Sequence, residues 1–153
     1  MRLLILAVGK LKKNTPEDTL IQNYIKNAVY PITVKEIDIH KNLPTEQQKK
    51  EESASLLKAV PPHTKIIVLD EKGAQMTSRD FAGTLSKWQD AGCEQVAFLI
   101  GGAYGHSTDL KDKADLLLSL GKMTMPHMLA RVVLTEQLYR AGLIAQNHPY
   151  HKD

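Results

Sequence analysis

The sequence has few of the features that mark secreted, membrane-spanning or disulfide-bonded proteins. Cys93 is its only cysteine, so the chain can form no internal disulfide and nothing points to an oxidising compartment. The longest apolar runs, Leu3–Val8 and Val96–Ile100, fall far short of the roughly 20 residues that a membrane-spanning helix needs. The first of these runs is also too short for a secretory signal, and it leads into a lysine-rich loop. We therefore expect a cytoplasmic protein with no membrane segment.

The size and composition indicate one globular domain over residues 1–153. Hydrophobic residues make up 42% of the chain and charged residues 24%, which is typical of a folded rather than a disordered protein. The 20 lysines and arginines exceed the 17 acidic residues by three. A net charge of +3 permits a nucleic-acid partner without requiring one.

Strand-like and helix-like segments alternate along the whole chain. Helix starts are marked by Thr15 before Pro16, by a capping box that opens at Thr45, by Thr77 and by Ser107. Such alternation predicts an α/β fold with a mostly parallel sheet and helices on both faces. The predicted strands are 2–8, 32–39, 65–69, 95–100 and 116–120, and the predicted helices are 16–29, 45–59, 77–91 (stopped by Gly92), a short one after Ser107, and 126–146.

The last predicted helix, 126–146, is apolar on more than one side. Val132, Leu134 and Leu138 are among the apolar positions, and together these cover more than one stripe of the helix surface. A helix of this kind is buried on two sides. In so small a chain we expect the second side to pack against another subunit, which predicts a homodimer.

Three strand ends mark a candidate ligand site. In parallel sheets, ligands bind beyond the carboxyl ends of the strands. Leu69 and Asp70 lie at one such end, the glycine-rich turn 101–105 follows another, and the loop 120–126 follows a third. We expect the three to converge on one crevice.

The turn and the loop each allow two interpretations. The turn reads G-G-x-x-G rather than G-x-G-x-x-G, and the stretch Ile100–Ser107 contains no lysine or arginine. This disfavours a dinucleotide or triphosphate and leaves either a ligand with few or no phosphates, held by backbone groups, or a tight turn with no ligand. The loop 120–126 is apolar, contains Gly121, and could hold an adenine ring or be an ordinary connection.

The C-terminal segment 147–153 concentrates polar chemistry. His148 and His151 could accept a proton near neutral pH, Tyr150 could stack on a base, and Lys152 could contact a phosphate. The alternative is a frayed chain end. Arg131, one turn after His127, could bind phosphate or pair with a carboxylate. No spacing of histidines with the single cysteine supports a metal site.

Several motifs, in order from end to end, resemble the bacterial ribosomal RNA large subunit methyltransferase H family. They are Leu3-Leu4-Ile5-Leu6-Ala7-Val8-Gly9-Lys10, Leu99-Ile100-Gly101-Gly102 with Gly105, Leu118-Ser119-Leu120 with Met123-Thr124-Met125-Pro126-His127, Arg131-Val132 with Glu136-Gln137-Leu138-Tyr139-Arg140-Ala141, and His148-Pro149-Tyr150-His151-Lys152. In one departure, Ala103-Tyr104 stand where many members have Pro-Glu, and we assign these two residues no role.

The resemblance implies a fold and an activity that periodicity alone could not indicate. The fold is that of the SPOUT superfamily, in which the C-terminal part forms a trefoil knot. The activity is transfer of a methyl group from S-adenosyl-L-methionine to N3 of a pseudouridine in 23S rRNA on the assembled ribosome. The family acts as a homodimer with its site at the subunit interface, and it uses no metal.

The resemblance also assigns residues to roles. The implied cofactor contacts are Leu69, Gly101, Leu120, Gly121, Lys122, Met123, Thr124 and Met125. The tail would face the RNA through Tyr150 and Lys152. Arg131 matches a family arginine, and we expect it to be a catalytic residue together with His151 and His148. The attacking imide nitrogen must lose a proton, and our first choice of acceptor is His151, our second His148, with water as the alternative.

Two other functions compete with this one. The first is a non-enzymatic, dimeric ribosome- or RNA-binding factor that has kept the cofactor pocket, which would bind the cofactor without turnover. The second is a flavodoxin-like protein, disfavoured because the segment after the first strand, Gly9-Lys10-Leu11-Lys12, lacks a hydroxyl-rich phosphate loop.

Overall fold

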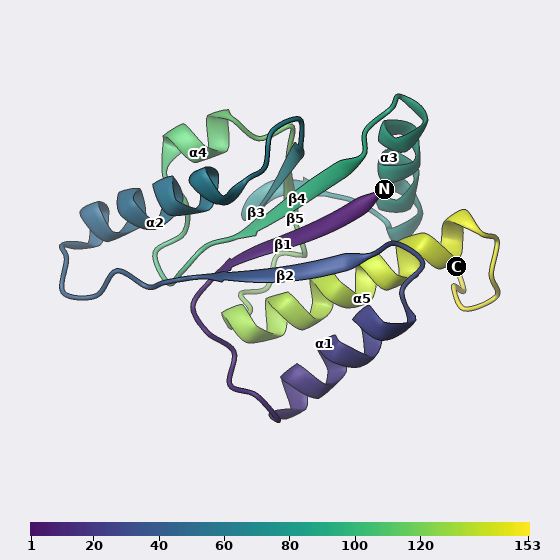
Figure 1. Cartoon of the computed structure of the whole chain (residues 1–153), viewed down its shortest axis with the longest axis horizontal. Helices are drawn as coiled ribbons and strands as arrows, with labels where there is room; N and C mark the ends of the chain where they lie inside the picture. Colours follow the sequence, from purple (N-terminus) through teal and green to yellow (C-terminus); the bar gives the residue numbers. More distant parts are fainter.

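The computed structural model describes all residues from Met1 to Asp153 and contains five strands alternating with five helices (Figure 1). The strands are β1 (Arg2–Val8), β2 (Ile32–Ile37), β3 (Lys65–Gln75), β4 (Gln95–Ile100) and β5 (Leu116–Ser119). The helices are α1 (Pro16–Asn27), α2 (Thr45–Ala59), α3 (Ser78–Asp90), α4 (Thr108–Asp112) and α5 (His127–Ala145). The predicted alternation of strands and helices is confirmed.

The five strands form one sheet in the order β2-β1-β4-β3-β5, and every pairing is parallel. β1 lies inside the sheet, and its residues from Leu3 to Val8 are all buried. Leu3, Ile5 and Ala7 point into one hydrophobic cluster, whereas Leu4, Leu6 and Val8 point into the other. A strand buried on both faces is apolar throughout, which is why the sequence reads as a continuous apolar run there.

Helices cover both faces of the sheet, as predicted. Side chains of α3 and α5, among them Phe81 and Leu134, belong to the larger cluster, and α1 packs against α5 on the same face. Leu56 of α2 and Leu110 of α4 belong to the smaller cluster on the opposite face (Figure 1). None of the helices has the length and apolar character that a bilayer-crossing helix needs.

Local capping explains most of the helix starts. The side chains of Thr15, Thr77 and Ser107 each accept a hydrogen bond from a backbone N–H three residues later, as the sequence predicts. The prediction for Thr45 was wrong, because Pro44 is the N-cap residue and no side chain caps this helix. Proline fixes its own φ, at −54° here, so Pro44 takes the N-cap position and Thr45 is the first residue of the helix.

The third strand is longer than the predicted 65–69. β3 continues to Gln75 after an irregularity, since Leu69 and Ala74 both pair with Leu118 and residues 70–73 lie outside the regular pairing. The apolar pattern ends at Leu69 because the residues at this irregularity are mostly polar, so the sequence does not indicate that the strand continues. Gly73 is required there, because a Cβ at this position would lie 2.6 Å from the carbonyl carbon of Leu117. The strands ending at Ile37 and Ser119, and α1 ending at Asn27, are one or two residues shorter than predicted.

The final helix is buried largely by its own chain. α5 lies between α1 and α3 on one face of the sheet, and eight of its residues are buried. This packing accounts for much of its two-sided apolar character. Leu129 remains 46% exposed, on a part of α5 that no element of the chain covers.

Candidate active site

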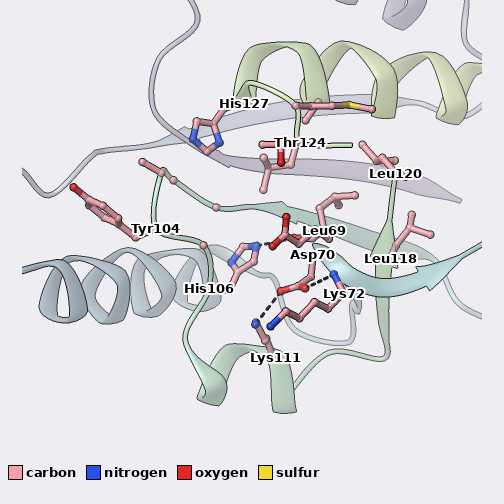
Figure 2. Close-up of a pocket in the computed structure, with 18 of the residues that line it drawn as sticks. Leu69, Asp70, Lys72, Tyr104, His106, Lys111, Leu118, Leu120, Thr124 and His127 are labelled. Carbon is pink, nitrogen blue, oxygen red and sulfur yellow. Dashed lines mark hydrogen bonds and ion pairs between the residues drawn. The ribbon is translucent and has the colours of Figure 1, made fainter. Parts of the chain in front are cut away.

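A cavity of about 450 Å³ lies at the carboxyl ends of the strands, where the sequence predicts a crevice (Figure 2). Residues 69–72 at the irregularity of β3, the glycine turn after β4 and the loop between β5 and α5 form its walls. Its volume lies in the range of small-molecule sites, which is about 300–1,000 Å³. The parallel topology brings these three segments together although they are far apart in the sequence.

Most of the residues that the family resemblance assigns to the cofactor lie on these walls. Leu69, Gly101, Leu120, Gly121, Met123, Thr124 and Met125 line the cavity. Lys122 is not among the lining residues, although its two neighbours are. Gly121 has a φ of +137°, a conformation that side-chain-bearing residues rarely adopt, and Ser119 fixes the turn by accepting a hydrogen bond from the Gly121 N–H.

His106 is a cavity residue that sequence reasoning missed. Its side chain is buried, and its Nε2 lies 3.1 Å from the carbonyl oxygen of Leu69 (Figure 2). A carbonyl only accepts, so Nε2 carries the proton and the ring connects the glycine turn to β3 at the start of its irregularity. Nδ1 is then an acceptor, and it is buried without a partner. Burial lowers the pKa of His106 to about 4, so the ring is neutral at physiological pH.

Asp70 and two lysines form a charged part of the wall. The Asp70 carboxylate lies 2.9 Å from Nζ of Lys111 and accepts a hydrogen bond from the backbone N–H of Lys72 at 2.8 Å (Figure 2). Partial burial opposes ionisation of Asp70, but these two contacts outweigh it and hold its pKa below the usual range. The glycine turn itself has no cation, yet the fold brings Lys111 and Lys72 to the same cavity.

The glycine turn is drawn tightly against buried side chains. A Cβ on Gly101 would lie 2.9 Å from Cε1 of His106, and a Cβ on Gly102 would lie 2.6 Å from Oε1 of Glu52. Gly105 has a φ of +78°. Only glycine therefore fits at these positions, and the backbone of the turn faces the cavity with no side chain in the way.

Arg131 does not line the cavity. Its guanidinium is buried, donates to the carboxylate of Glu36 at 2.8 Å, and donates to the carbonyl oxygen of Gly9 at 3.2 Å. Partial burial would raise the pKa of Glu36, but the arginine outweighs it and lowers that pKa. Of the two interpretations offered for Arg131, the structure shows carboxylate pairing, made within the chain. His127, one turn earlier, does line the cavity.

The C-terminal segment is packed and hydrogen-bonded, which contradicts the alternative of a frayed end. The Tyr150 hydroxyl donates to Glu136 at 3.1 Å, and the Tyr150 ring packs edge-on against Tyr139. Glu136 also accepts from Arg140 at 2.6 Å. The ring of His151 lies between Arg140 and Asp153, with each contact at 3.1 Å.

Both tail histidines already use the lone pair that a base would need. Arg140 has only donors, so Nδ1 of His151 accepts from it. Nδ1 of His148 accepts from the backbone N–H of Tyr150 at 3.1 Å. In the free chain, neither neutral ring therefore has a vacant acceptor nitrogen.

The tail lies at the C-terminal end of α5 (Figure 1), whereas the cavity lies at the other end of this helix. His127 at the start of α5 lines the cavity, whereas Tyr150 and His151 contact residues in the second half of the helix. A helix of 19 residues is about 28 Å long. One chain thus does not bring His148, Tyr150, His151 or Lys152 to its own cavity. No group of three or more metal-ligating side chains occurs in the structure.

Comparison with known proteins identifies the family to which the chain belongs. Residues 1–151 match a family model described as "Predicted SPOUT methyltransferase". The chain is 49% identical over 152 residues to a protein of Paramagnetospirillum magneticum named Ribosomal RNA large subunit methyltransferase H, with 99% of each chain covered. Proteins of the same name from Rhodospirillum centenum and Paracoccus denitrificans are 42% and 38% identical, over 99% and 100% of each chain.

These matches extend over all five strands, the three walls of the cavity and the packed tail. Identity of this level over the full length of both chains goes beyond a shared fold or an isolated glycine turn. The chain is therefore a SPOUT methyltransferase and belongs to the ribosomal RNA large subunit methyltransferase H family.

Proposed function

We propose that the protein transfers a methyl group from S-adenosyl-L-methionine to N3 of a pseudouridine in 23S rRNA, acting on the assembled ribosome in the cytoplasm. The observation that carries the proposal is the cavity at the three strand ends, lined by seven of the eight residues that the family resemblance assigns to the cofactor. The names of the relatives support rRNA as the substrate class.

The residues of the cavity fit such a cofactor. Leu118, Leu120 and Met125 offer an apolar surface for a flat ring, and the glycine turn offers backbone groups at close range. His106 adds a buried acceptor nitrogen without a partner beside that turn. When bound, the cofactor supplies a methyl group already activated on a sulfonium, so the chain has mainly to align the reacting groups.

The proposal includes a homodimer, because the proposed chemistry needs both ends of α5. The tail of one copy would meet the cavity of the other if two copies packed in opposite directions along this helix. Leu129 on α5 and Met123 beside it are 46% and 85% exposed, which offers apolar surface for such contact. Each dimer would then have two equivalent sites.

The proton on the attacking nitrogen needs an acceptor. We propose His151 first and His148 second, with water as the alternative, and either imidazole must first release the donor that now occupies Nδ1. Tyr150 and Lys152 would contact the RNA by stacking and by charge. Arg131 is expected to act as a positioning residue, since it holds α5 to β2 through Glu36 and to the loop at Gly9.

We also propose that the C-terminal part forms the trefoil knot of the superfamily. The path of the chain is compatible with it, because β5 lies at one edge of the sheet and α5 then returns across the face to reach α1 near the other edge. Such knots are rare in proteins generally. The proposal therefore rests on family membership.

The test uses ribosomes from cells that lack the modification. They are incubated with the protein and S-adenosyl-L-methionine, and the digested rRNA is analysed by mass spectrometry for N3-methylpseudouridine. We expect the product only when protein and cofactor are both present. Saturable cofactor binding without any methyl transfer would instead favour the non-enzymatic binding factor, and a methyl group on another nucleoside would contradict the substrate assignment alone.

A further inference from the structure

A single carboxylate oxygen in the tail joins two groups from different parts of the chain. Oδ1 of Asp153 accepts a hydrogen bond from Nε of Arg79 at 2.5 Å and lies 3.1 Å from Nε2 of His151. Arg79 belongs to the first turn of α3, whereas His151 and Asp153 belong to the segment after α5. Nothing in the proposed reaction uses this contact.

The orientation of the His151 ring shows that both groups are donors. Arg140 donates to Nδ1 of His151 at 3.1 Å, and a guanidinium has no acceptor. The ring proton therefore lies on Nε2, which donates to Asp153. Two N–H donors, one of them cationic, thus converge on one oxygen anion. This arrangement is that of an oxyanion-binding site, with Asp153 as its present occupant.

The donors are held in place independently of Asp153, but the carboxylate is held weakly. The His151 side chain is only 12% exposed and is fixed by Arg140, which is itself paired with Glu136 at 2.6 Å. The Arg79 and Asp153 side chains are 57% and 68% exposed. Exposed ion pairs contribute little to stability, so another anion can replace the carboxylate at low cost.

The charges around the site favour a nucleic-acid phosphate as that anion. Arg79 lies at the start of α3, where the helix dipole also attracts negative charge. Lys152 is exposed beside the site and makes no ion pair in the structure. Arg140 lies behind His151, with its guanidinium 4.8 Å from the centre of the Tyr150 ring.

We infer that Arg79 and His151 form a binding site for a phosphodiester of the RNA, and that Asp153 occupies this site in the free protein and is displaced when RNA binds. The inference rests on the proposed function for its choice of RNA. Where it holds, it leaves His148 or water as the proton acceptor, because a His151 ring that accepts from Arg140 at Nδ1 and donates to the phosphate from Nε2 has no vacant nitrogen. A phosphate oxygen would take the place of Oδ1 and accept the same two hydrogen bonds. The exchange is one anion for another, with no change of protonation and no covalent step.

Removing the competing carboxylate should therefore tighten RNA binding. Asp153→Asn keeps the size of the side chain and removes its charge. We expect this variant to bind a labelled short single-stranded RNA about two- to fivefold more tightly than the unaltered protein, measured by fluorescence anisotropy at low salt. The matched control is Asp80→Asn, which removes the same charge next to Arg79. Asp80 is exposed, and its carboxylate makes no hydrogen bond or ion pair.

The gain should depend on Arg79. In an Arg79→Gln background, Asp153→Asn should give no more than the control substitution gives. The salt dependence supplies a second readout, because each phosphate that an arginine neutralises releases counterions from the RNA. Arg79→Gln removes one such contact, so the slope of log K against log salt should become shallower by about 0.7.

Two outcomes would overturn the inference: a gain with Asp153→Asn no larger than with Asp80→Asn, or a gain that persists without Arg79. A failure to detect RNA binding by the Asp153→Asn variant at low salt also counts against it. The methyl-transfer assay separates this result from the proposed function. Normal methylation with no gain in RNA affinity rejects the phosphate site alone, whereas the gain without methylation rejects the proposed function alone.

Discussion

The buried imidazole of His106 predicts that stability falls when the pH is lowered from 7 towards 5. Its pKa is about 4 in the folded chain, because of burial, against an ordinary value of 6.5. Between these values the unfolded chain binds more protons than the folded chain, so the free energy of unfolding decreases as the pH falls. The full shift corresponds to about 3 kcal/mol, of which about 2 kcal/mol should be lost between pH 7 and pH 5.

Urea unfolding at several pH values, followed by the fluorescence of Trp88, measures this loss. The comparison variant is His106→Gln, because its amide can still donate to the carbonyl of Leu69 but does not titrate in this range. Carboxylates with lowered pKa values, such as Asp70, act in both proteins alike and mainly at lower pH. Protein concentration is kept constant, since association would make the apparent stability depend on it.

The difference between the two pH curves gives the contribution of the His106 ring alone. The free energy of unfolding of the unaltered protein should fall by about 2 kcal/mol more than that of the variant between pH 7 and pH 5. Parallel curves would refute the reasoning, because they would mean that the ring is solvated or changes its partner on folding. A steeper curve for the variant would refute the assigned sign.

Three further predictions follow from close contacts, a buried ion pair and the tail histidines. Gly73→Ala should lower the free energy of unfolding by about 1–3 kcal/mol, because the new Cβ would lie 2.6 Å from a backbone atom. Gly83→Ala should raise it by up to about 1 kcal/mol, because Gly83 is in a helix and a Cβ there would meet nothing within 4 Å. Urea unfolding measures both changes. Arg131→Met should lower the free energy of unfolding by about 3 kcal/mol in the same assay, because it leaves the partly buried carboxylate of Glu36 without its partner. A loss of less than about 0.5 kcal/mol would show that water replaces the guanidinium. The double substitution of His148 and His151 by alanine should slow methyl transfer by about 10²–10⁴-fold with cofactor affinity retained, and an unchanged rate would exclude both as proton acceptors.

Local patterns in the sequence predicted much of the fold because they act over short distances. Thr15, Thr77 and Ser107 cap helices through bonds to residues three positions away, so their chemistry is visible in the sequence. The capping box at Thr45 failed because the neighbouring Pro44 already fixes the backbone there. The extension of β3 beyond Leu69 escaped prediction because its support comes from pairing with β5 and not from its own apolar pattern.

The site was predictable in position but not in its contacts. The rule for strand ends located the walls at Leu69, Gly101 and Leu120, which do line one cavity. The role of His106 left no local signal, because its partner is a backbone carbonyl 37 residues away. Arg131 likewise pairs with Glu36, 95 residues away, and a sequence alone does not indicate which of many carboxylates that is.

The strand order has a consequence for the newly made chain. β1 leaves the ribosome before the other four strands, and its neighbour on one side, β2, follows about 30 residues later, since Leu3 pairs with Ile32. Its other neighbour is β4, and Arg2 pairs with Gln95, 93 residues further along. At about 5–20 residues per second, this edge of a strand that is apolar from Leu3 to Val8 waits roughly 5–20 s for its partner. During that interval it is a template for wrong pairing with other chains, so synthesis rate and chaperone access should govern the yield of this protein more than the stability of its finished fold.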